Sequence, residues 1–70
     1  MMILKNNIKL ARVKAGDLTQ QQLAELVGCS RQTINSIEKA KFNPSIELVL
    51  KIAKALNSTV DEIFYLKIEE

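Results

Sequence analysis

Four hydroxyl residues, each standing directly before a run of apolar residues at helical spacing, constrain the fold of this chain most. They are Thr19, Ser30, Ser45 and Thr59. A Ser or Thr at such a position accepts a hydrogen bond from a free N–H group in the first turn of a helix. Only one Pro and two Gly interrupt the 70 residues. The sequence therefore predicts one all-α domain of short helices spanning residues 1–70.

The helix limits follow from these caps and from the apolar periodicity. We expect helices over residues 8–15, 20–27 and 31–39, a fourth after Ser45 and a short fifth after Thr59. Gly28 should end the second helix, because glycine adopts positive φ at little cost. The inner face of the fourth helix is expected to comprise Ile46, Val49, Leu50, Ala53 and Leu56.

The two ends of the chain follow another pattern. "MILK" (residues 2–5) and "YLKIE" (residues 65–69) are short, rich in β-forming residues and partly alternating, so they can pair as an antiparallel ribbon. A lone two-stranded ribbon is only marginally stable in water. We therefore expect it to pack on the first helix, where it would cover Leu10, or on a second subunit.

Composition excludes several classes of function. With one Cys and no His, the chain can form neither an internal disulfide nor an ordinary zinc site, and no metal or other cofactor is expected. The lack of an acid–base histidine and the scattered carboxylates argue against an enzyme. The apolar runs are too short to cross a bilayer, and the N-terminus lacks the apolar core of a signal peptide. These features predict a cytoplasmic protein that does not bind membranes.

Residues 20–39, "QQQLAELVGCSRQTINSIEK", carry the most specific pattern. Ala24 lets two helices cross closely, and Gly28 turns the chain. Ile34 and Ile37 can bury helix 31–39 against helix 20–27. This spacing is what a helix-turn-helix requires. The remaining side chains of helix 31–39 are mostly amides, hydroxyls and an arginine, which suit hydrogen bonding to base edges and phosphates.

Residues 18–64, "LTQQQLAELVGCSRQTINSIEKAKFNPSIELVLKIAKALNSTVDEIF", resemble the Xre family, the helix-turn-helix of phage repressor and Cro proteins. The resemblance implies a five-helix repressor-like domain that binds double-stranded DNA as a homodimer, with helix 31–39 in the major groove. It implies a sequence-specific transcriptional regulator, with a repressor as the leading interpretation. The operator would be approximately palindromic, with recognition helices about 34 Å apart. No small-molecule ligand is expected.

The resemblance also implies roles for individual residues. Those expected at base edges are Arg31, Gln32, Thr33 and Ser36, and Arg31 could equally bind a phosphate. Those expected along the DNA backbone are Gln20, Ser30, Asn35, Lys39, Lys41 and Asn43. Gln20 would hold a phosphate through its side chain and the N-terminus of its helix. Arg12 and Glu38 resemble a structural ion pair that braces the first helix against the third.

The dimer surface is expected at the C-terminal end of the chain. Its candidate residues are Val60, Ile63, Phe64 and Leu66, because one small core cannot bury every apolar side chain there. A second interpretation stays open, in which the chain is an antitoxin-like or adaptor protein whose main target is a partner protein. The lack of a second domain or a long disordered tail disfavours it.

Overall fold

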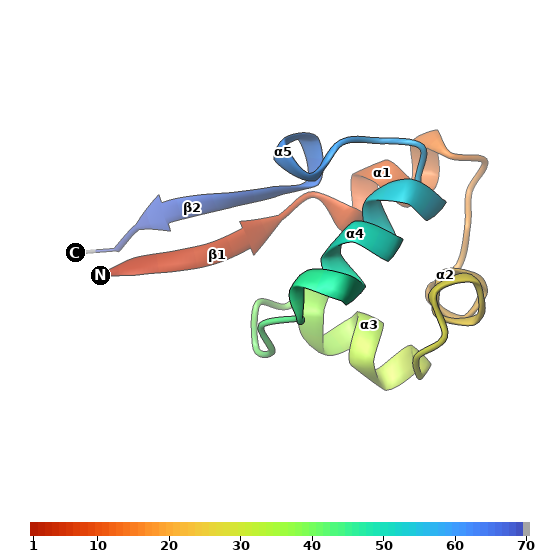
Figure 1. Ribbon diagram of the computed structural model, residues 1–70, viewed down its shortest axis with the longest axis horizontal. Coiled ribbons are helices and arrows are strands. Elements are labelled where there is room, and N and C mark those ends of the chain that lie inside the picture. Colours follow the sequence, from red (N-terminus) through yellow and green to blue (C-terminus); the bar gives the residue numbers. More distant parts are fainter. Residues whose placement is uncertain (70) are drawn as a thin grey trace.

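The computed structural model describes residues 1–69 as a small helical body with a projecting ribbon (Figure 1). The elements in chain order are β1 (Met2–Asn6), α1 (Ile8–Lys14), α2 (Gln20–Val27), α3 (Arg31–Glu38), α4 (Ile46–Ala55), α5 (Val60–Ile63) and β2 (Phe64–Ile68). Within these residues the predicted helical fold, with its helix-turn-helix and terminal ribbon, is confirmed. No helix in residues 1–69 is both long and apolar enough to traverse a bilayer.

The hydroxyl residues cap the helices as the sequence predicts. The side chains of Thr19, Ser30, Ser45 and Thr59 accept hydrogen bonds from the backbone N–H groups of Gln22, Thr33, Leu48 and Glu62. In α2 and α5 the third helical residue returns a bond to the cap, which completes a capping box. Since such a cap contributes about 1 kcal/mol, four of the five described helix starts are fixed by local sequence.

The start of α1 is made differently. Asn7 precedes the helix but makes no capping bond with its side chain. Instead, Asn6 Oδ1 accepts the Ile8 N–H at 3.2 Å, while Asn6 Nδ2 donates to the carbonyl of Ile37 at 2.7 Å. The amide of Asn6 therefore starts α1 and ties it to α3.

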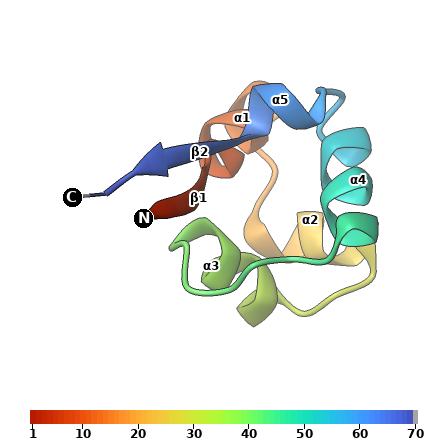
Figure 2. The same ribbon diagram turned by 60° about the vertical axis from the view of Figure 1, so that its left-hand side comes forward.

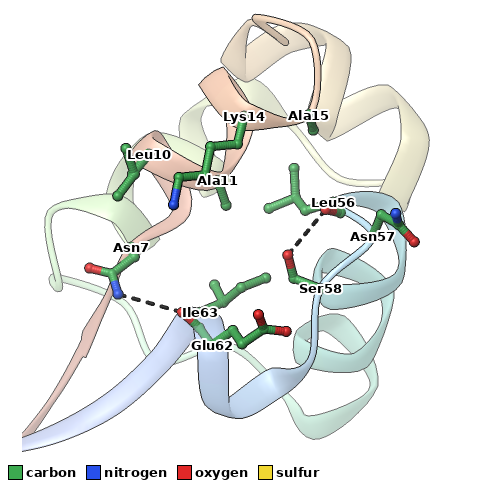
Figure 3. Close-up of a pocket in the computed structure, with 10 residues that line it drawn as sticks. All are labelled: Asn7, Leu10, Ala11, Lys14, Ala15, Leu56, Asn57, Ser58, Glu62 and Ile63. Atoms are coloured by element: carbon green, nitrogen blue, oxygen red, sulfur yellow. Dashed lines mark hydrogen bonds between the residues drawn. The ribbon is translucent and has the colours of Figure 1, made fainter.

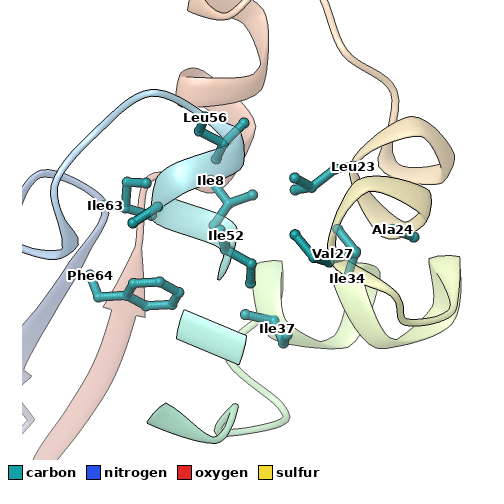
Figure 4. Packing of buried hydrophobic residues seen from close by; sticks show 11 residues of the cluster. Ile8, Leu23, Ala24, Val27, Ile34, Ile37, Ile52, Leu56, Ile63 and Phe64 are labelled. Atoms are coloured by element: carbon teal, nitrogen blue, oxygen red, sulfur yellow. The ribbon is translucent and has the colours of Figure 1, made fainter. Parts of the chain in front are cut away.

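A single core lies between the helices (Figure 4). Its buried residues are Ile8, Leu23, Ala24, Val27, Ile34, Ile37, Ile52, Ala53, Leu56, Ile63 and Phe64. Each large aliphatic side chain buried there contributes about 1.5–3 kcal/mol relative to exposure. Ile34 and Ile37 bury α3 against α2, so the helix-turn-helix is held by the residues that predicted it.

The inner face of α4 differs from the prediction at two residues. Ile46 is 80% and Leu50 is 55% exposed, whereas Ile52, which was not predicted, is fully buried. At about 100° per residue, the buried stripe centres near Leu56, and Leu50 lies roughly 120° from that centre. The prediction for Ile46 and Leu50 was wrong because the core covers a narrower stripe of α4 than its apolar residues occupy.

β1 and β2 pair antiparallel, in a register that runs from Met2↔Ile68 to Asn6↔Phe64. The inner half of the ribbon meets the helical body, where Phe64 is buried and Leu4 packs against the core. Asn7 N–H donates there to the Ile63 carbonyl at 2.7 Å. The outer end projects away from the helices (Figures 1 and 2). Leu10 remains 54% exposed, so the prediction that the ribbon covers it was wrong.

Candidate nucleic-acid interface

α3 has one buried side and one exposed side. Its buried residues are Ile34 and Ile37, while Arg31 and Gln32 in its first turn are exposed. Thr33 and Ser36 are half-buried. The structure therefore brings the four predicted base-reading residues to the accessible part of one helix, beginning at its N-terminal end.

A shallow hollow of about 190 Å³ lies beside this helix. Its lining residues are Ser30, Gln32, Thr33, Ser36 and Phe42. The hydroxyls of Ser30 and Thr33 are 2.9 Å apart and share a hydrogen bond, so each has a protein partner. Phe42, which is 48% exposed, was not among the predicted contacts. Its position as an aromatic residue in a loop of polar residues could have indicated it.

The loop after α3 carries three of the predicted backbone contacts. Lys39, Lys41 and Asn43 are all exposed there. The loop is shaped by Ala40, whose φ is +58°, and by a bond of 2.9 Å from the Lys41 N–H to the Ser36 carbonyl. Neither lysine forms an ion pair with the part of the chain that the structure describes. Both ammonium groups are thus available to a phosphate.

The predicted ion pair between Arg12 and Glu38 is present. Arg12 Nε lies 2.7 Å from Glu38 Oε2, and Arg12 Nη2 donates to Glu38 Oε1 at 3.1 Å. Both side chains are nearly buried, at 11% and 10% exposure. Arg12 Nη1 also donates to the Leu18 carbonyl at 2.8 Å. One guanidinium therefore joins α1, the loop before α2, and α3.

Gln20 adds α2 to this network. Its Nε2 donates to Glu38 Oε1 at 3.1 Å and to Asn35 Oδ1 at 3.2 Å. Gln20 and Asn35 are half-buried, and both line a groove of about 750 Å³ together with Lys9, Lys39 and Arg12. Two of the three amides predicted to lie along the DNA backbone, Gln20 and Asn35, are thus in direct contact.

The structure revises the predicted dimer surface. Ile63 is 1% and Phe64 is 7% exposed, so both side chains are used by the core of the protomer and are not available for a dimer contact. Val60 is half-buried, and Leu66 is 62% exposed. Val60 lines one hollow with Leu50, which joins α5 to the unexpectedly exposed face of α4.

A separate pocket of about 310 Å³ lies between α1 and the turn that joins α4 to α5 (Figure 3). Lys14 and Glu62 supply its charged groups. The Glu62 carboxylate accepts hydrogen bonds from the backbone N–H and the side-chain hydroxyl of Thr59. These bonds, the backbone bond most strongly, hold the pKa of Glu62 below its ordinary value, and Lys14 adds a smaller effect in the same direction. None of the predicted DNA contacts lines this pocket.

Cys29, in the turn between α2 and α3, is half-buried and packs against the core. Burial raises the pKa of its thiol, which favours the unreactive protonated form. Residues 1–69 contain no group of three or more Cys, Asp or Glu side chains placed to hold a metal ion.

A helix-turn-helix that turns Arg, Gln, Thr and Ser outward on its second helix has the form of a DNA-binding domain. The model of the helix-turn-helix family matches residues 8–63, and the chain belongs to this family, in its Xre-like form. It is a transcriptional regulator that binds double-stranded DNA, and it is not an enzyme.

Similar proteins support this assignment. An uncharacterised HTH-type transcriptional regulator of Archaeoglobus fulgidus is 42% identical over 67 residues, which cover 96% of this chain and 93% of that protein. The crystal structure of a putative DNA-binding protein from Bacteroides fragilis matches with a TM-score of 0.77 and 31% identity, over 93% of this chain and 100% of that one. The restriction-modification controller protein C.AhdI from Aeromonas hydrophila matches with a TM-score of 0.71 and 33% identity, over 79% and 78% of the two chains.

Proposed function

We propose that this protein is a sequence-specific repressor that binds a palindromic operator as a homodimer, with α3 in the major groove. The observation that carries the proposal is the division of α3 into two sides. Ile34 and Ile37 are buried while Arg31 and Gln32 stand exposed in the first turn, which is the end of a recognition helix that meets base edges.

The exposed side chains have the chemistry for direct readout of bases. Arg31 can donate two hydrogen bonds to guanine, or bind a phosphate, and Gln32 can pair with the edge of adenine. The Thr33 hydroxyl is hydrogen-bonded to the Ser30 hydroxyl, while the Thr33 methyl group can contact the methyl group of a thymine. A good bidentate contact is worth about 1–3 kcal/mol of discrimination against a wrong base. Ser36, one turn further along the helix, can donate to a neighbouring base.

The remaining predicted contacts serve the DNA backbone. Ser30, Lys39, Lys41 and Asn43 lie at the two ends of α3 and in the loop after it, so they can flank the groove that α3 enters. Such contacts fix the register of a protein on the duplex without reading its sequence. Repression is the proposed outcome because a protein bound over a promoter excludes polymerase by occupancy alone.

The homodimer is proposed from apolar side chains that the core leaves exposed. Leu50 on α4 lines a hollow with Val60 on α5, and Ile46 is exposed one helical turn before Leu50. Leu66 on β2 is a second exposed candidate. A two-fold dimer presents the same surface on both subunits and would place two copies of α3 on successive turns of one face of DNA.

The DNA proposal is tested by fluorescence anisotropy at about 150 mM salt, where phosphate contacts alone give weaker binding than at low salt. The duplexes are the region upstream of the protein's own gene and a scrambled version of it. A preference of roughly 10³-fold or more is expected for a specific site. Gln32→Ala should lower that preference, while Lys51→Ala on the outer side of α4 is the matched control. Equal, weak binding to both duplexes would contradict an operator in this region.

The sign of regulation is tested with a reporter gene driven by the same upstream region. Supplying the protein should lower expression of the reporter. Increased expression would identify an activator and refute the repressor proposal.

The dimer is tested by light scattering on Leu50→Asp and Leu66→Asp, with Val13→Asp, another exposed apolar position on α1, as the control. A charge in the interface should convert a dimeric mass to a monomeric one, because an unpaired buried charge is strongly unfavourable. Retention of the dimeric mass by both variants would place the interface elsewhere, and a monomeric wild-type protein bound singly to DNA would overturn the homodimer.

A further inference from the structure

The side-chain amide of Gln20 faces the protein. Its nitrogen donates to Glu38 Oε1 at 3.1 Å and to Asn35 Oδ1 at 3.2 Å. An amide nitrogen carries two hydrogens, so both donors of Gln20 are engaged. A phosphate oxygen can only accept hydrogen bonds. The Gln20 side chain in this arrangement therefore has no donor left for the DNA backbone.

The orientation of this amide is imposed by its neighbour. A carboxylate only accepts hydrogen bonds, so Glu38 requires the nitrogen of Gln20, and not its oxygen, to face it. Glu38 is itself held by Arg12, through contacts of 2.7 Å and 3.1 Å. Because Arg12 and Glu38 are 11% and 10% exposed, they form a fixed support for the Gln20 amide.

The same logic sets the orientation of Asn35. Its oxygen accepts from Gln20, so its NH₂ group is the free end of the amide. Asn35 Nδ2 donates to no acceptor within residues 1–69. Asn35 lies in the groove that Lys9 and Lys39 also line, and Lys39 follows it by one helical turn. The groove thus presents the ammonium groups of Lys9 and Lys39 beside the amide of Asn35.

We propose that Asn35, and not Gln20, supplies the side-chain amide donor to a DNA phosphate where α2 meets α3. Gln20 and Glu38 are positioning residues, which fix the end of the Asn35 amide that faces the DNA. An Asn free to rotate could present its oxygen to the phosphate, and the two would repel. This inference rests on the proposed placement of α3 in the major groove, which brings the DNA backbone past the junction of α2 and α3.

Binding of a random-sequence duplex at about 50 mM salt tests the proposal, because phosphate contacts operate on any sequence. Asn35→Leu removes the donor at similar size and should weaken binding about tenfold or more, as expected for a lost bond to a charged group. Asn35→Asp presents only acceptors and should bind more weakly still. Gln20→Met should lose less than Asn35→Leu, and the double variant Gln20→Met/Asn35→Leu should bind no more weakly than Asn35→Leu alone.

Three further measurements separate this role from a structural one. The slope of affinity against salt should stay unchanged in Asn35→Leu and Gln20→Met, because a neutral amide displaces no counterion. Thermal unfolding identifies any variant that has lost its fold. In NMR spectra of the free protein, the NH₂ protons of Gln20 should exchange slowly with solvent, and those of Asn35 should become protected only when DNA is added.

The proposal is overturned if Gln20→Met weakens binding as much as Asn35→Leu and the two losses multiply in the double variant. It is also overturned if the NH₂ group of Asn35 is already protected in the free protein. Operator preference is measured separately, with the native and scrambled duplexes. A protein without that preference would refute the sequence-specific regulator and still leave this test on random DNA decisive.

Discussion

Removing either member of the Arg12–Glu38 pair should destabilise the protein more than removing both. The two side chains are 11% and 10% exposed and joined by two hydrogen bonds. Loss of one partner leaves the other charge nearly buried without its counter-charge, which costs about 3–5 kcal/mol. A 70-residue domain has roughly 4–10 kcal/mol of total stability, so Arg12→Met or Glu38→Met should remove a large fraction of it.

The double variant Arg12→Met/Glu38→Met leaves no unpaired charge. Its remaining cost comes from two groups that lose a partner, the Leu18 carbonyl, bonded to Arg12 at 2.8 Å, and Gln20 Nε2, bonded to Glu38 at 3.1 Å. At about 1 kcal/mol for each net hydrogen bond, the double variant should be roughly 2 kcal/mol less stable than the wild type. The sum of the two single costs would be at least about 6 kcal/mol.

Urea unfolding followed by circular dichroism at low temperature measures all four free energies of unfolding. The Lys51–Glu47 pair is the matched control, because its nitrogen and oxygen are 3.4 Å apart but the side chains are 54% and 77% exposed. Lys51→Met should cost no more than about 0.5 kcal/mol. Additive losses in the Arg12/Glu38 cycle would refute the reasoning, since they would mean that neither charge depends on the other.

Two further predictions concern local structure. Gly28 has a φ of +79°, and no neighbour lies within 4 Å of an added Cβ, so Gly28→Ala should cost about 1–2 kcal/mol through backbone strain alone; Gly28→Asn should cost less, and equal Tm values for all three proteins would contradict this. The pKa of Glu62 is lowered by its bonds to Thr59, so its carboxylate stabilises the fold above the ordinary Glu pKa of about 4.3, and this effect is lost as pH falls through the lower folded value. The Tm advantage of the wild type over Glu62→Gln should therefore shrink in acid, and a difference that is constant from neutral pH to about pH 2 would contradict the assignment.

The sequence predicts helix starts well because they are decided within four residues. Thr19, Ser30, Ser45 and Thr59 each bond to an N–H three positions later, and no distant contact competes with that bond. The helix-turn-helix is equally local, since Ala24, Gly28, Ile34 and Ile37 span little more than a dozen residues. The Arg12–Glu38 pair was predicted through family resemblance, because local rules do not join residues 26 positions apart.

The errors arise where distant elements compete for one small core. Apolar periodicity placed Ile46 and Leu50 on the inner face of α4, but the available core space is taken by Ile52, Ala53 and Leu56. The reverse occurred at the C-terminal end, where Ile63 and Phe64 were expected at the dimer surface and are buried in the core. Periodicity identifies which residues can share a face; the neighbouring elements determine how wide a face is covered.

The roles proposed for Gln20 and Asn35 show a further limit of predicting function from residue type alone. Both are amides at positions that suit a phosphate, so the sequence gives them the same function. The hydrogen bonds distinguish them, because Glu38 engages the nitrogen of Gln20 and Gln20 engages the oxygen of Asn35. The side-chain amide that is free to donate therefore belongs to Asn35 of α3 and not to Gln20 of α2. If this order persists on DNA, the buried pair that stabilises the fold also orients a contact to the DNA backbone, and substitutions of Glu38 should affect stability and DNA affinity together.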